Sequence, residues 1–482
     1  MKLKKLIKNL DLEVKGSREV EVSGICSHSQ SITPGSLFIA KKGKTFDGRE
    51  FIPEAIETGA AAVLTDIYNP FLQRVVQLVT SDVNKLEALL AKRYYETEKH
   101  PLYLIGITGT NGKTTTAYII HHLIPDFGLM GTVETIIGKE RFQARLTTAD
   151  VITNHKTLRE MADRGLEGAV MEVTSHALDQ DRVREIRFDS AIFTNLSQDH
   201  LDYHRTMDDY FKAKLKLFEQ ARFKIYNLDD PRAEAFHQGM TFGIRSPADL
   251  QAKNIRVSLE GTRFDLHMNG HSFPIKSPLL GEYNVYNLLA ALAAGLKKGA
   301  SLSTLRRRLH TFPGVPGRLE PIDNPKGIHL FVDFAHTPEA LSSVLETLHP
   351  FKTGRLITVF GCGGERDRTK RPKMGRVAEK YSDRLIITSD NPRFEDPEAI
   401  CKEIVTGISS EAIIEIDRRS AIERGISMAE EGDIVLIAGR GHEPFRQIKG
   451  SLLPFDDREV ANKILDSSSG SFEDREVKDL DP

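Results

Sequence analysis

The chain has 482 residues, a length typical of about three domains, and 40% of them are hydrophobic, enough for several cores. Its formal net charge is −2, so overall charge does not direct it to nucleic acid or to an anionic membrane. Three scattered cysteines without CxxC spacing argue against a disulfide framework and a zinc site, and they fit a reducing compartment.

The first residues predict an amphipathic helix rather than a targeting segment. Leu3, Leu6, Ile7 and Leu10 are interleaved with lysines, which interrupts the apolar run that a signal peptide needs. No apolar stretch of the sequence approaches the ~20 residues that span a bilayer. We therefore expect a cytoplasmic protein without membrane insertion.

Apolar strand candidates alternate with helical stretches in three blocks, which predicts α/β architecture with buried parallel sheets. Residues 1–98 hold short β-rich runs and predict a small α/β domain. Residues 99–312 open on the strand-like YLIGI and predict a mostly parallel sheet. Residues 313–466 alternate strand and helix most clearly, and GVPGR (314–318) is a plausible hinge before them. The polar, mostly acidic end, 467–482, predicts a disordered tail.

The most informative run is YLIGITGTNGKTTTAYIIHHL, in which an apolar strand enters a glycine-rich loop and then a helix. Glycines let backbone N–H groups converge on phosphate oxygens, and the helix N-terminus adds a favourable dipole. Lys113 is predicted to lie along the β- and γ-phosphates and Thr114 to bind Mg²⁺, although Ile107 stands where the standard motif has glycine. The predicted ATP-binding segment comprises Gly109, Thr110, Asn111, Gly112, Lys113, Thr114 and Thr115.

Candidate metal ligands follow two strands of the same block. Glu172 ends the strand-like GAVMEV, and His200 follows SAIFTNL; two such residues at strand ends favour a metal site over two structural side chains. In the helix after them, Lys214 shares an apolar stripe with Tyr210 and Leu217, so it is the lysine expected to be partly buried. Burial favours a neutral amine, which can react with CO₂, but periodicity alone favours a lysine that reaches solvent.

The motifs TGTNGKTT, NLSQDHLDYH, NVYNLLAA, GRLE and DFAHTP together resemble those of the Mur ligase family, and the resemblance extends over almost the whole chain. It implies an ATP-dependent amide-bond ligase with an N-terminal UDP-binding domain, a central ATPase domain with a phosphate loop and a C-terminal Rossmann-like domain. The implied catalytic residues are Lys113, Glu172, His200 and Lys214. Two Mg²⁺ ions are implied, with ligands from Thr114, Glu172, His200 and a carbamylated Lys214. Further ATP contacts are implied for Asn287, Arg318, Asp333 and His336, with Phe334 where the family usually has tyrosine.

Other segments resemble the family's binding site for the UDP-muramoyl dipeptide. The implied contacts are Ser29, Thr147, Thr148, Thr174, Gln180 and Arg182. Thr174 stands where serine is common and keeps the hydroxyl. His28 and Gln30 replace the usual Asp and Arg beside Ser29, so the detailed uridine contacts are left open.

The run SDNPRFEDP contains the DNPR signature of the branch that adds meso-diaminopimelate. Diaminopimelate differs from lysine by a second amino-acid end with a carboxylate, which an arginine fork can hold with two hydrogen bonds. The implied diaminopimelate contacts are Arg366, Asp390, Asn391, Arg393, Gly439 and Glu443. Glu443 is suited to the distal ammonium, and Arg440 stands where the family usually has lysine.

The resemblance implies that ATP phosphorylates the γ-carboxylate of D-Glu in UDP-MurNAc-L-Ala-D-Glu and that diaminopimelate attacks the acyl phosphate. We expect a monomer with small-molecule substrates and no nucleic-acid partner. A lysine-adding ligase of the same family is the nearest alternative, and a catalytically silent ATP-binding regulator is another. Folylpolyglutamate synthetases share the phosphate loop but do not account for the first block or the DNPR run.

Overall fold

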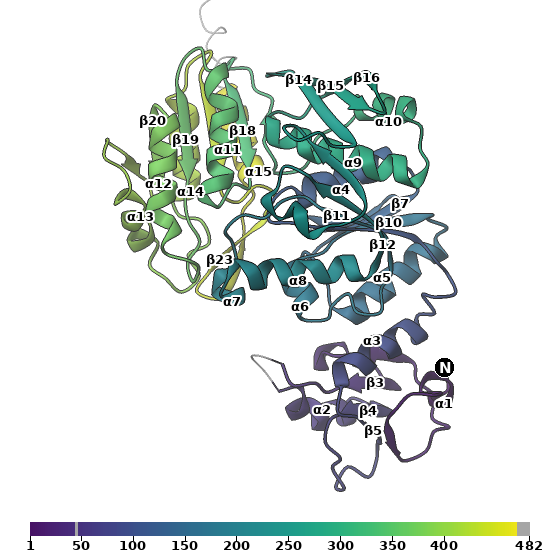
Figure 1. Ribbon diagram of the computed structural model, residues 1–482. Coiled ribbons are helices and arrows are strands. Elements are labelled where there is room, and N and C mark those ends of the chain that lie inside the picture. Colours follow the sequence, from purple (N-terminus) through teal and green to yellow (C-terminus); the bar gives the residue numbers. More distant parts are fainter. Residues whose placement is uncertain (44–46, 470–482) are drawn as a thin grey trace, which may run out of the picture. The chain divides into compact units, whose positions relative to one another are not determined.

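The computed structural model describes residues 1–43 and 47–469, and their helices and strands are labelled in Figure 1. These residues form two compact units. The first unit holds Met1–Lys113, Ile124–Tyr226 and Glu234–Gly239, and the second holds Thr114–Leu123, Asn227–Ala233 and the residues from Met240 onward. Each unit contains parallel strands with helices against them, so the predicted α/β class is confirmed. In the described residues, no helix combines the length and hydropathy that crossing a membrane requires.

A five-stranded sheet in the order β1-β5-β4-β3-β2 begins the first unit. Four strands pair in parallel, and β1 joins β5 antiparallel. The strands are β1 (Glu13–Lys15), β2 (Gly24–Cys26), β3 (Ser36–Ile39), β4 (Ala62–Thr65) and β5 (Val76–Val79). The helices are α1 (Leu3–Leu6), α2 (Ile52–Glu57) and α3 (Val83–Tyr94), with 3-10 turns η1 (Ser29–Ser31) and η2 (Gly48–Phe51).

Burial on both faces explains why these strands are continuous apolar runs in the sequence. In β3, Leu37 and Ile39 enter a core shared with α1 and α3, whereas Phe38 enters a second core shared with α2. The predicted N-terminal helix is shorter than expected. It ends at Leu6, and Asn9 adopts a left-handed φ of 58°.

Seven further strands of the first unit follow the order β12-β11-β6-β10-β7-β8-β9. Strands β12 to β7 are parallel, as predicted, while β8 and β9 add antiparallel pairs at the edge. The strands are β6 (Tyr103–Thr108), β7 (Phe127–Met130), β8 (Glu134–Ile137), β9 (Glu140–Gln143), β10 (Gly168–Glu172), β11 (Phe188–Phe193) and β12 (Ala221–Asn227). The helices are α5 (Val151–Asp163), α6 (Ser175–Asp179), α7 (Leu201–His204) and α8 (Met207–Glu219), and α5, α6 and α8 lie on one side of these strands (Figure 1).

The second unit contains α4 (Lys113–Leu123) apart from its first residue. A group of four strands follows the order β16-β15-β14-β13, with β14 to β16 antiparallel. These elements are β13 (Met240–Gly243), β14 (Leu250–Ser258), β15 (Gly261–Met268), β16 (His271–Ser277), α9 (Glu282–Lys298) and α10 (Leu302–Leu309). A 3-10 turn, η3 (Pro231–Ala235), precedes β13 in the chain.

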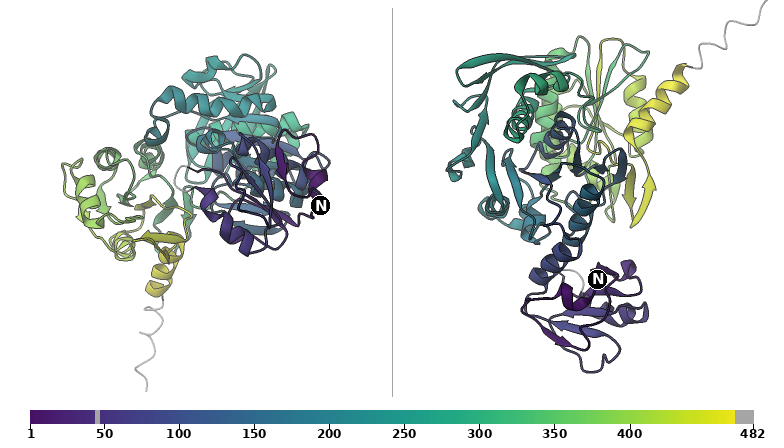
Figure 2. Two further views of the ribbon diagram at one scale, coloured as in Figure 1. Left: turned by 90° about the horizontal axis from the view of Figure 1, so that it is seen from below. Right: turned by 90° about the vertical axis from the view of Figure 1, so that its right-hand side faces the viewer.

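A six-stranded sheet in the order β17-β18-β22-β19-β20-β21 completes the second unit, with only β17 antiparallel. Its strands are β17 (Glu320–Ile322), β18 (His329–Asp333), β19 (Leu356–Phe360), β20 (Arg384–Ile387), β21 (Ile413–Ile414) and β22 (Ile434–Ala438). The helices, on either side of the sheet (Figure 2), are α11 (Pro338–Leu348), α12 (Lys370–Tyr381), α13 (Pro397–Val405), α14 (Arg418–Ser427) and α15 (Asp457–Ser469), with η4 (His349–Phe351). A hairpin of β23 (Phe445–Ile448) and β24 (Ser451–Pro454) lies between β22 and α15 in the chain.

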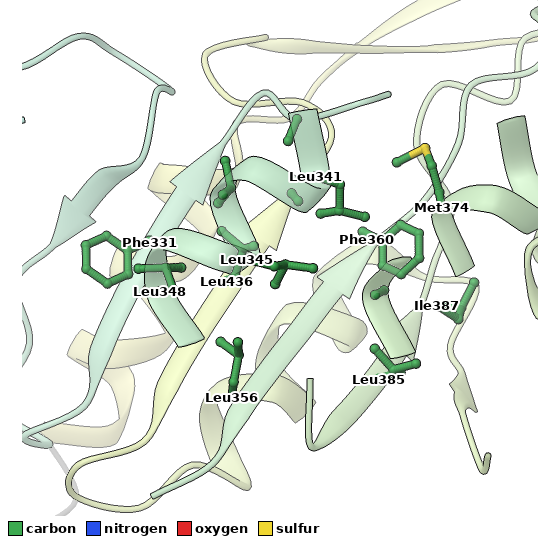
Figure 3. Packing of buried hydrophobic residues seen from close by; sticks show 14 of the residues in the cluster. Phe331, Leu341, Leu345, Leu348, Leu356, Phe360, Met374, Leu385, Ile387 and Leu436 are labelled. Atoms are coloured by element: carbon green, nitrogen blue, oxygen red, sulfur yellow. The ribbon is translucent and has the colours of Figure 1, made fainter. Parts of the chain in front are cut away.

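Neighbouring residues of these strands enter two different cores. Leu356 and Phe360 of β19 pack in a cluster with Met374 of α12 (Figure 3). Ile357 and Val359 belong to a second cluster, which contains residues of α14 and α15. This two-sided burial is the Rossmann-like arrangement predicted for the last block.

The predicted tail is wrong at its start. Helix α15 runs to Ser469, so residues 467–469 are helical. Ala461, Ile464 and Leu465 bury one face of this helix in the core, which stabilises its continuation beyond the predicted boundary. The rest of the predicted tail, 470–482, lies outside the described residues.

Candidate active site

Three neighbouring strands of the first unit end side by side, and candidate catalytic residues lie at or after these ends. The sheet register pairs Glu172 of β10 with Ile107 of β6, and Phe193 of β11 with Thr108 of β6. The glycine-rich loop leaves β6 directly after Thr108. Because open α/β sheets bind ligands at the carboxyl ends of their strands, this edge is suited to the nucleotide phosphates.

The segment after β11 holds the glycine-rich loop. Asn111 N donates to Asn195 Oδ1 at 2.9 Å, and Thr194 Oγ1 donates to Asn111 O at 2.7 Å. Lys113 Nζ donates to the carbonyl of Gly109 at 2.9 Å. The lysine is thus folded back over the loop, where the phosphates of a nucleotide are cradled in motifs of this kind. Thr194 and Asn195 received no role from the sequence, since their contacts cross between strands.

Position 109 requires glycine, both because of its backbone conformation and because of close packing. Its φ is +151°, and a Cβ atom there would come within 1.8 Å of Thr194 Oγ1. We expect Gly109→Ala to lower the free energy of unfolding by about 2–4 kcal/mol and to weaken ATP binding at least about tenfold. Thermal denaturation and titration calorimetry with ATP would measure the two effects.

Gly138→Ala is the matched control. Gly138 also has a positive φ, of +62°, but its Cβ would meet nothing within 4 Å. Only the left-handed backbone cost of about 1–2 kcal/mol is expected there, with ATP binding unchanged. Unaltered ATP affinity in Gly109→Ala would contradict the role given to this loop.

Lys214 lies against the same loop and is buried more completely than the helical spacing alone predicted. Its side chain is 2% exposed, whereas Lys212 on the neighbouring stripe is exposed. Its Nζ donates to Gly109 O at 2.8 Å and lies 4.3 Å from the centre of the Tyr210 ring. Burial lowers the pKa of Lys214 well below its ordinary value, and the charge of Lys113 acts in the same direction. These surroundings favour the neutral amine, the form that reacts with CO₂.

Glu172 is fully buried at the end of β10 and is held by a threonine from the loop after β7. Its Oε1 accepts from Thr132 N at 2.8 Å, and its Oε2 accepts from Thr132 Oγ1 at 3.0 Å. A Cβ on Gly131 would come within 2.5 Å of Glu172 Oε1, so a side chain there would displace the carboxylate. Thr132 was missed because nothing in its local sequence distinguishes it.

His200 belongs to a cluster of aromatic rings. Its backbone is left-handed, with φ 54°, and its ring centre lies 4.7 Å from that of His176 and 6.0 Å from that of Tyr210. Burial lowers the pKa of His200, Lys113 and Lys214 act in the same direction, and the adjacent Asp199 opposes them. The neutral imidazole, which can bind a metal, is therefore favoured at neutral pH.

His176 is a site residue that the sequence analysis did not select. Its ring centre lies 4.2 Å from that of Tyr203, and burial, helped by His200 and His204, lowers its pKa to about 4. The signal available was the clustering of histidines in the two neighbouring runs SHALD and DHLDYH. Within residues 1–43 and 47–469, no three His, Cys, Asp or Glu side chains are grouped so that they could hold a metal ion.

Five of the six residues predicted to bind the UDP-dipeptide form one hydrogen-bonded network with Glu172. Thr148 Oγ1 donates to the carbonyl of Glu172 at 2.9 Å and accepts from Thr174 N at 3.1 Å. Arg182 Nη1 donates to Thr148 O at 2.9 Å, and its Nη2 donates to Gln180 Oε1 at 2.7 Å. Thr147 joins through Thr132, whose Oγ1 lies within hydrogen-bond distance of Thr147 Oγ1, at 3.2 Å. The sixth, Ser29, lies in turn η1 beside the five-stranded sheet.

In the second unit, two of the predicted ATP contacts lie against α4. Arg318 Nη2 donates to Thr114 Oγ1 at 3.4 Å, and the guanidinium stacks 4.5 Å from the ring centre of Phe334. Thr116 Oγ1 donates to Asn287 Oδ1 at 3.4 Å, so Asn287 approaches the same helix. The phenylalanine that replaces the family's usual tyrosine thus supplies a stacking face for Arg318.

Asp333 and His336 have local partners that limit the roles predicted for them. The carboxylate of Asp333 is buried and accepts from Leu319 N at 2.6 Å and Ala335 N at 2.7 Å. Burial raises the pKa of Asp333, and Arg318 opposes that shift. His336 Nδ1 is 3.0 Å from Phe334 O. A ribose contact by Asp333 would use the remaining lone pairs of an already engaged carboxylate.

The six residues predicted to bind diaminopimelate lie in loops after three adjacent parallel strands, β22, β19 and β20. Arg366 follows β19, Asp390, Asn391 and Arg393 follow β20, and Gly439 and Glu443 follow β22. This is the edge at which a Rossmann-like sheet binds its ligand. We refer to these six residues as the amino-acid pocket.

Close contacts define the amino-acid pocket. Asn391 Nδ2 donates to Glu443 Oε2 at 2.8 Å, and Arg393 Nη1 donates to the carbonyl of Gly364. Gly439 has a φ of +114°, and a Cβ there would come within 2.8 Å of Asp390 Oδ2. The glycine therefore lets the two loops approach each other.

Charges of both signs meet in the pocket. Burial lowers the pKa of Arg393 and the neighbouring Arg366 acts in the same direction, which indicates a site suited to a carboxylate. Burial raises the pKa of Glu443 and Asp390 acts in the same direction, which indicates a site suited to a cation. These six residues therefore combine cationic and anionic side chains at one sheet edge.

Comparison with known proteins agrees with this geometry. Residues 21–95 match the family described as Mur ligase family, catalytic domain, residues 107–295 match the Mur ligase middle domain, and residues 317–441 match the Mur ligase, glutamate ligase domain. The UDP-N-acetylmuramoyl-L-alanyl-D-glutamate–2,6-diaminopimelate ligase of Syntrophomonas wolfei is 42% identical over 96% of this chain and 99% of its own length.

Two solved structures have the same fold. A UDP-N-acetylmuramoyl-L-alanyl-D-glutamate–2,6-diaminopimelate ligase is 33% identical, with a TM-score of 0.70 over 97% of this chain and 99% of that one. MurF from Thermotoga maritima in complex with ADP is 19% identical, with a TM-score of 0.66 over 94% of this chain and 99% of that one. The matched family models and the 42% identical relative show that this chain belongs to the Mur ligase family.

Proposed function

We propose that this chain is an ATP-dependent ligase that joins meso-diaminopimelate to the γ-carboxylate of D-Glu in UDP-MurNAc-L-Ala-D-Glu, in cytoplasmic peptidoglycan precursor synthesis. The observation that carries the proposal is the amino-acid pocket, where Arg393 and Arg366 lie with Glu443 at one sheet edge. The Syntrophomonas relative bears the name of this activity.

The pocket matches the chemistry that distinguishes diaminopimelate from lysine. The distal end of diaminopimelate carries both a carboxylate and an ammonium, whereas lysine ends in an ammonium alone. Arg393 and Arg366 would hold the carboxylate, and Glu443 would hold the ammonium. Lysine would leave the half-buried Arg393 without an anion, which is costly, so the lysine-adding alternative is disfavoured.

The proposed reaction has two steps. A γ-carboxylate oxygen of D-Glu attacks the γ-phosphorus of ATP, the bond to the ADP oxygen breaks, and an acyl phosphate forms. The deprotonated amine of diaminopimelate then attacks the acyl carbon, and inorganic phosphate leaves as the amide forms. Lys113, held over the phosphate loop, would neutralise charge on the transferred phosphoryl group. Arg318, placed beside Thr114, would contact the same phosphates.

Magnesium is part of the proposal because the donors present suit it. Glu172 offers a buried, oriented carboxylate, His200 a neutral imidazole and Thr114 a hydroxyl. Lys214 would become a ligand only as a carbamate, and its burial and neutral amine suit that modification. When bound, two Mg²⁺ ions would neutralise the anionic carboxylate and phosphates as they approach. A catalytically silent ATP-binding regulator would not need this complete set of candidate metal ligands.

The remaining assignments are proposed on the same basis. Residues 1–98 would bind the UDP end through Ser29, 99–312 would bind ATP, and 313–466 would bind diaminopimelate. Gly109 to Thr115, Asn287, Arg318, Asp333 and His336 would contact ATP. Thr147, Thr148, Thr174, Gln180 and Arg182 would contact the dipeptide, a role supported by their shared network. We expect a monomer.

The test is a phosphate-release assay with mass identification of the product. We expect phosphate release to require ATP, UDP-MurNAc-L-Ala-D-Glu, diaminopimelate and Mg²⁺ together, and the product to be the UDP-tripeptide. Lys113→Ala serves as the inactive control, because it removes the cation over the phosphate loop. Nucleotide binding without any amide product would support the regulator instead.

A further inference from the structure

A buried arginine outside the amino-acid pocket connects the two loops that carry the arginines of that pocket. Arg371 lies in the first turn of α12, and its side chain is 0% exposed. Its Nη1 donates to Glu395 Oε2 at 2.9 Å, and its Nη2 donates to Glu395 Oε1 at 3.0 Å. Nη2 also donates to the carbonyl of Gly363 at 3.2 Å, and Nη1 donates to Glu403 Oε2, in α13, at 2.8 Å. One guanidinium thus joins the loop after β19, which contains Gly363, to the loop after β20, which contains Glu395.

The carboxylate of Glu395 extends this connection to the backbone beside both pocket arginines. Its Oε1 accepts from the N–H of Glu365, the residue directly before Arg366. The N–H of Glu395 donates to Pro392 O at 3.0 Å, so Glu395 is tied to the turn that contains Arg393. Hydrogen bonds between an arginine fork and a carboxylate are strong and fix direction as well as distance. The pair of Arg371 and Glu395 therefore holds the two loops at one separation.

The separation of the two loops affects the pocket directly, because they touch next to it. Gly364 N donates to Asn391 O at 2.9 Å, and Arg393 Nη1 donates to the carbonyl of Gly364. A Cβ on Gly364 would come within 2.0 Å of Pro392 O, so the two backbones are in close contact. The guanidinium of Arg393 is thus held by one loop while its backbone belongs to the other. A shift of either loop would move this guanidinium.

We propose that Arg371 is a positioning residue for the amino-acid substrate: through Glu395 it holds the loops after β19 and β20 so that Arg366 and Arg393 face the same distal carboxylate. Arg371 is fully buried, so it acts through Glu395 rather than by contact with the ligand. Without the pair, both pocket arginines remain but their separation is no longer fixed, and binding of the carboxylate weakens. This inference rests on the proposed function, since the carboxylate belongs to diaminopimelate.

The test compares two variants that each neutralise one carboxylate beside the same buried arginine. Glu395→Gln weakens the connection between the loops, and we expect it to raise the KM for diaminopimelate about tenfold, with KM for ATP unchanged and kcat within about threefold.

The matched control is Glu403→Gln, which removes the partner of Arg371 on α13. The side chains of Glu395 and Glu403 are 26% and 28% exposed, so the two substitutions remove the same charge at similar burial. Glu403 also pairs with Arg368 of the loop after β19, but that arginine is 66% exposed, where an ion pair contributes little. The KM of Glu403→Gln for diaminopimelate should therefore stay within about twofold of the wild-type value.

A double-mutant cycle with Arg371→Lys separates positioning from general stabilisation. This variant keeps the charge and loses the planar fork that meets both oxygens of Glu395, so its KM for diaminopimelate should also rise. If Arg371 acts through Glu395, the combined variant raises the KM by clearly less than the product of the two single effects.

Three results would overturn the inference: single effects that multiply, equal rises of KM in Glu395→Gln and Glu403→Gln, or a KM within twofold of wild type in Glu395→Gln. Should Arg371→Lys not fold, the comparison of the two glutamate variants decides, with thermal denaturation showing that each is folded. Absence of turnover in the wild type would instead count against the proposed function.

Discussion

Replacing Lys214 by alanine is expected to lower kcat by about a hundred- to a thousandfold, because the variant loses the carbamate proposed to hold Mg²⁺ beside the reacting phosphate. The side chain is 2% exposed and its amine lies 2.8 Å from the carbonyl of Gly109, so the modified group would reach the phosphate loop. Steady-state phosphate release at saturating substrates measures the loss.

Chemical rescue distinguishes the carbamate from a purely structural lysine. In Lys214→Ala, a small carboxylate such as formate can enter the space that the side chain leaves, and we expect it to restore part of the activity. Lys214→Arg is the matched variant, because arginine keeps a donor for Gly109 O but cannot form the carbamate. Full activity in Lys214→Arg would show that the lysine only braces the loop and would contradict the modification.

Replacing Arg393 by alanine is expected to lower kcat/KM for diaminopimelate by about thirtyfold to several thousandfold, the effect of removing one partner from a buried charge pair. The fork of Arg393 lies in a pocket where burial and Arg366 depress its pKa, so a bound carboxylate gains strongly from it. The KM for ATP should not change, since the nucleotide contacts proposed lie elsewhere. Kinetics with each substrate varied in turn measure this difference.

Two companion variants make this result specific. Arg393→Lys keeps the charge and loses the fork, so an intermediate effect is expected. Arg376→Ala removes an exposed arginine of α12 and should leave all kinetic constants at their wild-type values. If Arg393→Ala retains wild-type kcat/KM for diaminopimelate, the DNPR loop does not bind the distal carboxylate.

The parts of the site that the sequence could predict are those set by local pattern. The choice of Lys214 as the most buried lysine of its helix followed from its stripe with Tyr210 and Leu217, because a helix repeats every 3.6 residues, and that choice is confirmed. Its almost complete burial was not predicted, since periodicity alone favoured a lysine that reaches solvent. The position of Glu172 at a strand end followed in the same way from a continuous apolar run, and it too is confirmed.

What could not be predicted is which side chains meet across long stretches of chain. The hydrogen bond from Thr132 to Glu172 connects residues 40 positions apart in the chain, and the hydrogen bond from Arg440 to Asn391 connects residues 49 positions apart. Periodicity shows which face of an element is buried, but it does not show which partner lies opposite. The antiparallel strands β14 to β16 were missed for a different reason. Most residues of β14 and β16 are exposed or half-exposed, so these strands lack the continuous apolar run that marks a buried parallel strand.

The most direct test of the central claim is a competition between the two amines. The enzyme is given ATP, Mg²⁺ and UDP-MurNAc-L-Ala-D-Glu with equal concentrations of meso-diaminopimelate and L-lysine, and the products are separated by mass. We expect the diaminopimelate product to exceed the lysine product by at least about a hundredfold, because lysine leaves Arg393 without a carboxylate. Equal amounts of the two products, or an excess of the lysine product, would contradict the assignment of the amino-acid pocket.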